Sequence, residues 1–233
     1  MARTKPRPGD INLDSAPQML EYEAAADRIA AGAARRLLDW GCGWGQMTSL
    51  LIERGLDVTA FDFDAAAAGV EVRPLPRFPG LEATMSSDPI ALPFPDDTFE
   101  AVLSMGVLEH VMDPGASLDE LRRVLVPGGL VYCYKLPNRF SYLEFVARHT
   151  GRYFHGEDEF DRLYDVRSTR DIFGRHGFEV LELRRANMLP LTVPGALTDR
   201  LSPAIWRTNR GLARVPLLNT LATNVELVAR ASA

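Results

Sequence analysis

The sequence predicts an α/β fold, in which the strands of one sheet alternate with helices in a single domain. Three observations support this prediction. Residues 36–40 form a short apolar run that leads into closely spaced glycines, and a helical pattern begins at Gln46. Residues 56–64 form a second strand-like run directly after that helix. The chain has 233 residues, 46% of them hydrophobic, which is enough to bury one sizeable core.

The segment before the first strand, residues 16–34, is expected to form a helix. Apolar side chains such as Leu20 and Ile29 fall toward one side of it, and acids such as Glu23 and Asp27 fall toward the other. Residues 1–10 are basic, but no apolar segment follows them, and no run approaches the roughly eighteen apolar residues of a membrane span. We therefore expect a soluble protein that is not exported.

The first strand ends in a turn that can bring a ligand against the main chain. Gly41, Gly43 and Gly45 allow a sharp turn with no Cβ between backbone and ligand. Dinucleotide enzymes usually space these glycines as G-x-G-x-x-G, because a pyrophosphate lies on the helix N-terminus. Here the spacing is G-x-G-x-G, and Asp39 would repel a phosphate but could accept from the ammonium of a methionine moiety. The spacing therefore favours S-adenosylmethionine over NAD.

The second strand supplies a second acid. Asp62 lies about twenty residues after the turn, where a carboxylate can accept from both hydroxyls of a ribose. The glycines alone would fit an ordinary strand-to-helix loop equally well. The two acids at strand ends, together with the glycines, favour one nucleoside ligand.

Taken in order, these segments resemble the class I S-adenosylmethionine-dependent methyltransferases that act on small molecules. Residues 88–99, DPIALPFPDDTF, resemble the family segment in which an acid binds the adenine amino group and the next residue lines the ring. The resemblance therefore implies these roles for Asp88 and Pro89. Residues 100–104 resemble the fourth strand of the family, and residues 105–114 resemble the loop and helix after it.

The resemblance continues through residues 121–134, which are similar to the helix, proline-glycine turn and fifth strand of the family. It implies a Rossmann-like, doubly wound sheet of about seven strands, mostly parallel, with an antiparallel last strand at 222–229 and helical lid insertions. The whole chain would be one methyltransferase domain. Its parts would be an N-terminal cap at 1–34, a cofactor-binding core at 35–135, and acceptor lid segments at 136–176 and 187–221.

The implied cofactor is S-adenosylmethionine. The residues expected to bind it come from the leading helix, the glycine turn and the strand ends: Tyr22, Asp39, Gly41, Cys42, Gly43, Gly45, Asp62, Phe63, Asp88, Pro89, Ser104 and Met105. Two alternatives stand beside this set, since Tyr22 could instead pack on the sheet edge and Cys42 fits as a small residue better than as a nucleophile. The chain departs from the family pattern at Glu100, where Asp is usual, and in the proline-rich segment 73–80, where the third helix and strand are expected to be reduced.

Methyl transfer to a hydroxyl needs alignment and a base, and histidine is the usual base. His110 follows the fourth strand at the ligand-binding edge and neighbours Glu109, although in the resembling family this histidine often has a structural role. His149 and His155 are alternative candidates in the lid, whereas His176 is expected to cap a helix C-terminus. No set of side chains has metal-ligand spacing, so no metal is expected.

The two lid segments differ in composition. Residues 136–176 are rich in aromatic side chains, which could wall an apolar or aromatic acceptor or could simply pack on the core. Residues 200–218 carry four arginines, at 200, 207, 210 and 214, interleaved with apolar residues. Such a face could lie on an anionic membrane or bind a phosphorylated or lipid-linked acceptor, and otherwise it is an ordinary solvated face.

Charge and cysteine content exclude other classes. A formal net charge of −5 argues against binding nucleic acid. Cys42 and Cys133 are the only cysteines, too few for a disulfide framework, so we expect a cytoplasmic protein. A nicotinamide oxidoreductase would need the longer glycine spacing and a Tyr-x-x-x-Lys pair, and neither is present.

The acceptor is less constrained. The lid start KLPNRFSYLEF is similar to the polyprenyl-phenol O-methyltransferases of quinone biosynthesis. This resemblance implies O-methylation of a phenolic, polyketide, quinone-like or sugar hydroxyl in small-molecule biosynthesis. N- or C-methylation of a small molecule, or a catalytically silent cofactor-binding scaffold, are the alternatives.

Overall fold

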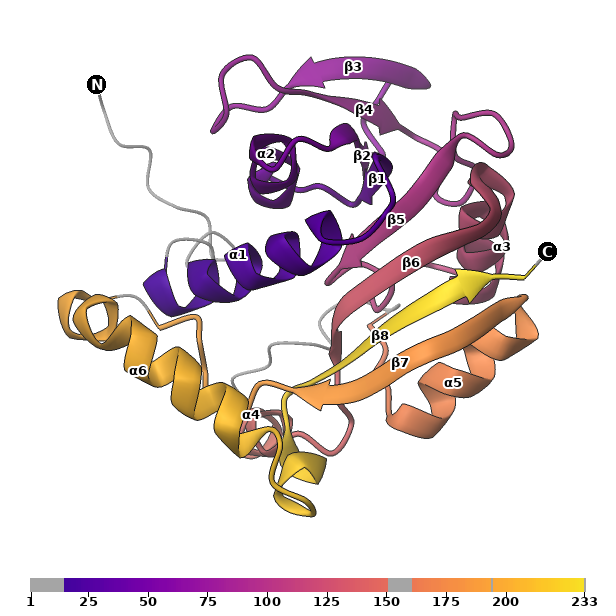
Figure 1. Cartoon of the computed structure of the whole chain (residues 1–233). Helices are drawn as coiled ribbons and strands as arrows, with labels where there is room; N and C mark the ends of the chain where they lie inside the picture. The colour runs from indigo at the N-terminus through magenta and orange to yellow at the C-terminus, as the bar shows by residue number, and fades with distance from the viewer. Residues whose placement is uncertain (1–14, 151–160, 194, 233) are drawn as a thin grey trace.

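The computed structural model describes residues 15–150, 161–193 and 195–232. Its centre is one eight-stranded sheet with helices on both faces (Figure 1). The strands are β1 (Arg36–Trp40), β2 (Asp57–Phe63), β3 (Val70–Pro74), β4 (Glu82–Ser86), β5 (Phe99–Met105), β6 (Leu125–Pro137), β7 (Phe178–Ala186) and β8 (Asn224–Ala231). The helices are α1 (Ala16–Ala30), α2 (Gln46–Glu53), α3 (Pro114–Val124), α4 (Tyr142–Thr150), α5 (Val166–Arg175) and α6 (Ala196–Leu212), followed by a short 3-10 helix, Leu218–Leu221.

The sheet has the strand order β3-β4-β2-β1-β5-β6-β8-β7. β4, β2, β1, β5 and β6 run parallel, and β8 is antiparallel to both of its neighbours, as the sequence predicted for the last strand. The chain reverses its direction of travel through the sheet between β1 and β5. At such a switch point the loops after two parallel strands diverge and leave room for a ligand.

The strand count is a correction, because the sheet has eight strands and not seven. The additional strand, β3, pairs antiparallel with β4 at the sheet edge. It begins at Val70 and alternates exposed and half-buried side chains as far as Pro74, where the proline ends the pairing at an edge, the position that tolerates a missing N–H donor. The expected reduction of the third helix therefore takes the form of a β-hairpin.

Two helix boundaries also differ from expectation. α1 ends at Ala30 rather than at residue 34, and residues 106–113 form turns instead of starting a helix. The next helix begins only at Pro114, where the Asp113 carboxylate accepts hydrogen bonds from the amides of Gly115 and Ala116. Proline in the first helical turn and an acid before it are both favoured at a helix start. The loop after β5 is therefore longer than predicted.

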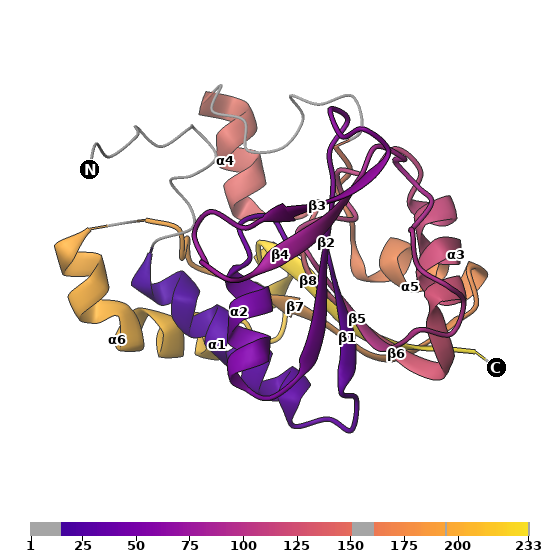
Figure 2. The ribbon, with the colours of Figure 1, turned by 90° about the horizontal axis from the view of Figure 1, so that it is seen from above.

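The core lies on both faces of the sheet. On one face α1 and α2 cover the sheet through side chains such as Ile29 and Leu51. On the other face α3 and α5 cover it through side chains such as Leu121 and Phe173. α6 lies beside α1, and α4 stands at the end of the sheet near the carboxyl ends of the central strands (Figure 2). No helix in the described part of the chain is long and apolar enough to cross a membrane.

Candidate functional site

A cavity of about 600 Å³ opens at the carboxyl ends of the central strands, beside the glycine turn. We call it the turn cavity. The ends of β1, β2 and β5 and the loop after β4 supply its walls, as expected for a ligand site at the switch point of an α/β sheet. Its lining residues are Trp40, Gly41, Phe61, Asp62, Phe63, Asp88, Pro89, Ile90, Leu92, Gly106, Val107, His110, Val111 and Met112.

The glycine turn has a left-handed backbone at each glycine, with φ of 75° at Gly41, 54° at Gly43 and 87° at Gly45. A Cβ on Gly41 would overlap the side chain of Val107, and one on Gly45 would lie 2.6 Å from Leu75 Cδ1. A Cβ on Gly43 would meet no protein atom within 4 Å. Gly41 and Gly45 are therefore required by packing, whereas the space beside Gly43 is available for a ligand.

Asp62 is held against this turn. Its Oδ2 accepts a hydrogen bond of 2.9 Å from the Gly43 amide, and its Oδ1 accepts one of 2.8 Å from the Phe63 amide. Burial raises the pKa of Asp62, although these two amides oppose the shift. Phe63 is 48% exposed at the mouth of the cavity, an unusual position for a phenyl ring. This pair of residues combines a hydrogen-bond acceptor with an apolar ring face.

Asp39 lies behind the turn and does not line the turn cavity, so its contact with the ligand's ammonium stays a prediction. Only 2% of it is exposed, and its Oδ2 accepts a hydrogen bond of 2.5 Å from Thr48 Oγ1 on α2. Burial raises the pKa of Asp39 to about 6, and the nearby Asp62 adds to the shift. Its observed contact joins β1 to α2, since the strand end turns the side chain toward the helix.

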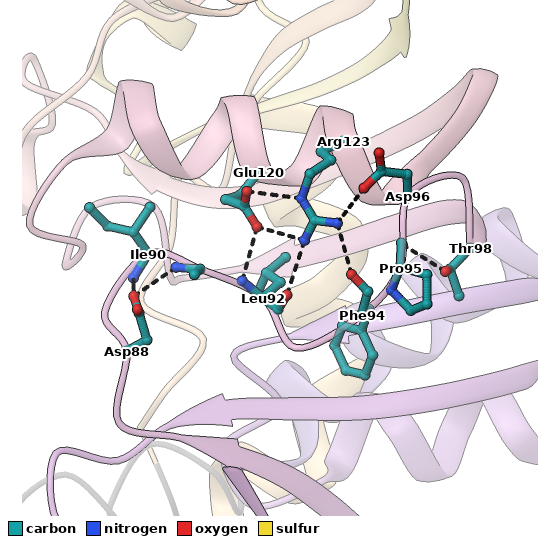
Figure 3. Close-up of polar contacts among 10 residues, drawn as sticks. Asp88, Ile90, Leu92, Phe94, Pro95, Asp96, Thr98, Glu120 and Arg123 are labelled. Carbon is teal, nitrogen blue, oxygen red and sulfur yellow. Dashed lines mark hydrogen bonds and ion pairs between the residues drawn. The ribbon is translucent and has the colours of Figure 1, made fainter. Parts of the chain in front are cut away.

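Asp88 lies on the loop after β4 and lines the turn cavity. Its Oδ1 accepts hydrogen bonds from the amides of Ile90, at 2.9 Å, and Ala91, at 2.8 Å, and these bonds lower the pKa of Asp88 (Figure 3). The side chain thus forms a turn with its own loop.

An arginine on α3 fixes the rest of this loop. Arg123 donates to the carbonyl oxygens of Leu92, at 3.0 Å, and Phe94, at 2.8 Å, and it pairs with Glu120 and Asp96 (Figure 3). Glu120 in turn accepts from the Leu92 amide at 3.0 Å. The loop that carries Asp88 and Pro89 is therefore held in place by a charged cluster that the sequence did not identify.

The remaining residues of the expected cofactor set lie at different distances from the turn cavity. Cys42 and Ser104 are buried and do not line it, and burial raises the pKa of the Cys42 thiol, which opposes a nucleophilic role. Tyr22 is buried on α1, with its hydroxyl accepting from Gln18 Nε2 at 2.9 Å and its ring 4.3 Å from Lys135 Nζ. Met105 lines a different cavity, described below.

The histidine candidates are separated by the fold. His110 lines the turn cavity, with Nδ1 2.6 Å from Asp161 Oδ1 and Nε2 3.8 Å from Glu109 Oε1. His149 lies exposed on α4 and contacts the Phe145 carbonyl at 2.7 Å. His155 falls outside the described residues. His176 ends α5, as predicted, and pairs with Asp119.

Glu109 is a buried acid beside this histidine. It is 2% exposed, its Oε2 has no hydrogen-bond partner among the described residues, and burial raises its pKa to about 7. Asp161 is the closer carboxylate to His110, although Glu109 is its neighbour in sequence. A contact made across 51 residues of chain gave no signal in the sequence.

A second cavity, of about 390 Å³, lies between α1, α6 and the ends of β6, β7 and β8. We call it the basic cavity, because it is lined by the cations Arg28, Lys135, Arg184, Arg185, Arg210 and Arg214 and by only two acids, Glu21 and Glu226. A third, smaller cavity of about 270 Å³ shares Glu21, Lys135 and Asn187 with it. We call this one the side cavity.

Among the described residues of the first lid segment, no aromatic side chain lines any of these three cavities. Phe140 and Phe145 point to solvent, and the Tyr142 hydroxyl donates to the Met188 carbonyl at 2.7 Å. Tyr164 is buried and donates to the Leu108 carbonyl at 3.1 Å. Tyr153, Phe154 and Phe160 lie outside the described residues.

In the described ranges, no three His, Cys, Asp or Glu side chains are grouped closely enough to hold an ion. The turn cavity is lined by two carboxylates, which accept hydrogen bonds, by the imidazole of His110 and by apolar side chains. This lining fits a nucleoside, whose ribose hydroxyls can donate to a carboxylate and whose base can pack on apolar side chains.

Comparison with protein families gives a match to a family described as a methyltransferase domain, over residues 38–133. An uncharacterized methyltransferase of Mycobacterium tuberculosis is 39% identical over 105 residues, which are 45% of this chain and 41% of the relative. A ubiquinone biosynthesis O-methyltransferase of Cereibacter sphaeroides is 29% identical over 180 residues, with 71% of this chain and 68% of the relative covered. The chain spans less than half the length of the first of these relatives.

Solved structures share the fold. A SAM-dependent methyltransferase from Archaeoglobus fulgidus matches 91% of this chain and 94% of its own, with a TM-score of 0.58 and 17% identity. The 1,6-didemethyltoxoflavin-N1-methyltransferase of Burkholderia thailandensis, solved with S-adenosylhomocysteine bound, also gives 0.58 at 17% identity, over 97% of this chain and 82% of its own. At this identity the likeness concerns the fold.

Proposed function

Because the chain carries a class I S-adenosylmethionine-dependent methyltransferase domain, we propose that it transfers a methyl group from S-adenosylmethionine to a small-molecule acceptor. One observation carries the proposal. The turn cavity has open space beside Gly43, with the carboxylate of Asp62 fixed next to it by the Gly43 amide. When bound, S-adenosylmethionine supplies an electrophilic methyl group on its sulfonium.

The chain's own residues would bind and orient this cofactor. The Asp62 carboxylate would accept from the ribose hydroxyls, the Phe63 ring would cover one face of the adenine, and Asp88 with Pro89 would lie at its edge; all four residues line the turn cavity. Gly41 lines the turn cavity and Met105 lines the neighbouring basic cavity, so both would lie between the cofactor and the acceptor. Alignment of donor and acceptor is the main requirement of an in-line transfer, and a base is needed only when the acceptor must lose a proton.

For the acceptor we propose a hydroxyl of a phenolic, quinone-like, polyketide or sugar compound. The similarity to a ubiquinone biosynthesis O-methyltransferase supports this choice. His110 is the proposed base, since it lines the turn cavity and its Nδ1 lies 2.6 Å from Asp161 Oδ1, a carboxylate that can orient the ring. His149 has less support because it lies exposed on α4.

Calorimetric titration with S-adenosylmethionine, S-adenosylhomocysteine and NAD tests the cofactor. We expect the first two to bind and NAD not to bind. Asp62→Ala should weaken the binding of S-adenosylhomocysteine at least tenfold. Asp57 is an exposed acid at the opposite end of the same strand, and Asp57→Ala should leave this affinity unchanged. Binding of NAD alone, or equal affinities for the two variants, would contradict the proposed site.

Methyl transfer to a panel of phenols and sugars tests the reaction and the base. We expect His110→Gln to lower turnover by about 10²-fold or more, the usual contribution of a general base, while S-adenosylhomocysteine still binds. Normal turnover of His110→Gln across the panel would show that His110 is not the general base.

The outer face of α6 is a separate proposal. Arg200 and Arg207 lie there with the exposed Leu197 and Leu201, which supports the predicted contact with an anionic membrane. Flotation with anionic and zwitterionic vesicles tests it: we expect binding to the anionic vesicles alone, and its absence would remove the proposal. The cytoplasmic location and the division of the chain into cap, core and lid segments also stay predictions.

A further inference from the structure

We propose that the basic cavity binds the acceptor through an acidic group, a carboxylate or a phosphate. The proposal rests on the proposed function in that it takes the ligand to be the methyl acceptor. It adds a chemical class of acceptor, namely one that carries a negative charge.

The first argument is charge. Six cationic side chains and two carboxylates line this cavity, although the formal net charge of the whole chain is −5. The cavity is therefore positively charged in an acidic protein. Ion pairs within the protein neutralise only part of this positive charge. Glu226 pairs with Arg184 at 2.7 Å, and Arg28 pairs with Glu182 outside the cavity lining. The remaining cations favour an anionic ligand.

The second argument is Arg210. It lies on α6 with its guanidinium 4.8 Å from the ring centre of Trp206, a contact that holds the side chain along the cavity wall. Among the described residues it forms no ion pair or hydrogen bond with a carboxylate. Partial burial and the nearby charges of Arg184 and Arg214 lower its pKa, and the carboxylates of Glu226 and Glu21 offset this shift only in part. A planar guanidinium is well suited to binding a carboxylate or phosphate through two hydrogen bonds.

The third argument is local strain and an unused donor. Lys135 and Asn187 line the cavity with φ of 64° and 63°. This left-handed backbone is costly for Lys135, whereas asparagine adopts it more readily, and strained residues of this kind cluster at functional sites. The Tyr134 hydroxyl, also in the lining, is buried and has no hydrogen-bond partner among the described residues. Burial raises the pKa of Tyr134, so the hydroxyl stays protonated and can donate a hydrogen bond to an anion.

The fourth argument is position. Met105 lines the basic cavity, and its neighbour Gly106 lines the turn cavity, so the two sites meet at the end of β5. The side cavity shares Glu21, Lys135 and Asn187 with the basic cavity and is walled by apolar residues such as Leu143, Leu189 and Leu191. An acceptor with an acidic group and an apolar body would therefore fill both cavities beside the methyl donor.

The test is calorimetric titration of three small probes into protein saturated with S-adenosylhomocysteine: 4-hydroxybenzoate, phenyl phosphate and the neutral phenol. We expect at least one anionic probe to bind tenfold or more tightly than phenol, and the preferred anion distinguishes a carboxylate from a phosphate. Arg210→Gln should weaken the binding of that probe at least tenfold, and Arg210→Lys should weaken its binding less. The matched control is Arg207→Gln, an exposed arginine on the same helix that lines none of the three cavities, and it should change the affinity less than twofold.

Two results would overturn the proposal: equal affinities for phenol and for both anions, or equal effects of Arg210→Gln and Arg207→Gln. Thermal unfolding of each variant confirms that it is folded. Failure of the proposed function is a separate outcome, because it would appear as loss of S-adenosylhomocysteine binding to the unmodified protein. In that case the same probes, titrated without the nucleoside, still test the anion site.

Discussion

At the residue scale, the glycine turn combines two different requirements. Gly41 and Gly45 lie against Val107 and Leu75, so a side chain there would collide with the protein itself. Gly43 faces the open space in which we propose the cofactor lies. The same residue type is therefore needed for packing at two positions and for ligand access at the third.

This difference predicts that two alanine substitutions affect different properties: Gly41→Ala mainly stability and Gly43→Ala mainly cofactor binding. Gly41→Ala should lower the free energy of unfolding by about 2 kcal/mol or more, from a left-handed backbone and overpacking. Val107→Ala in the same chain should restore part of that loss by removing the overlapping methyl groups. The free energy of unfolding of Gly43→Ala should lie within about 1–2 kcal/mol of that of the unmodified protein. The same variant should bind S-adenosylhomocysteine at least tenfold more weakly. Denaturant unfolding and calorimetry measure both quantities, and tight binding by Gly43→Ala would contradict the assignment of this space.

Glu109 predicts a pH dependence of stability. Burial raises its pKa from 4.5 to about 7, so between these pH values the folded state binds more protons than the unfolded state. Stability contributed by this group therefore falls as pH rises from 4.5 to about 7, by up to about 3 kcal/mol, and stays constant above that. Glu109→Gln should flatten the dependence in this window, as measured by denaturant unfolding at a series of pH values. An unchanged slope would mean that Glu109 keeps its ordinary pKa.

At the element scale, the buried side chain of Asn209 joins α6 to the segment that follows β7. Asn209 Oδ1 accepts from the amides of Met188, at 2.6 Å, and Leu189, at 2.8 Å, and its Nδ2 donates to Asn187 Oδ1 at 2.8 Å. These bonds join the helix to the segment after β7 and so form one wall of the basic cavity. The sequence predicted a lid insertion in this region, but it gave no means of identifying the residue that holds it.

Asn209→Ala should therefore loosen α6. Two backbone amides would lose their partner, at a cost of about 1–3 kcal/mol each, and we expect earlier protease cleavage within residues 196–212. Thr208→Ala, at an exposed neighbouring position, serves as the control and should leave both stability and cleavage unchanged. Asn209→Asp keeps the acceptor and loses the donor, so it should fall between the two. Equal cleavage rates for all three variants would show that α6 is held by its apolar contacts alone.

At the scale of the whole molecule, the parallel strands bring groups from distant parts of the sequence to one edge. The turn after β1, the end of β2, the loop after β4 and the loop after β5 all meet at the turn cavity. A ligand that contacts several elements at once stabilises the folded state against the unfolded one, because only the folded state assembles them.

S-adenosylhomocysteine at 100 times its dissociation constant should thus stabilise the protein by about 2.7 kcal/mol. For a chain of this size that corresponds to a rise in Tm of roughly 5–10 °C. Differential scanning calorimetry measures the shift, and NAD at the same concentration should produce none. A Tm that is insensitive to S-adenosylhomocysteine would contradict the proposed cofactor.

The sequence by itself determined the α/β class, the glycine turn, the antiparallel last strand and the position of Asp62 at the end of β2. The antiparallel direction of the last strand came from the family resemblance, whereas the other features depend on local spacing and apolar periodicity, which a sequence displays directly. The extra strand β3 was not predicted, because its pairing with β4 depends on a partner and on only five residues of weak pattern.

Only the tertiary structure decided which side chains share a cavity. It brought Asp161 to His110, turned Asp39 toward Thr48, and placed Arg210 of α6 in a cavity with Lys135 of β6. Each of these relations joins residues of separate elements, and it depends on the angle at which those elements pack. That angle follows from the fit of the whole core, so no local pattern in the chain encodes it.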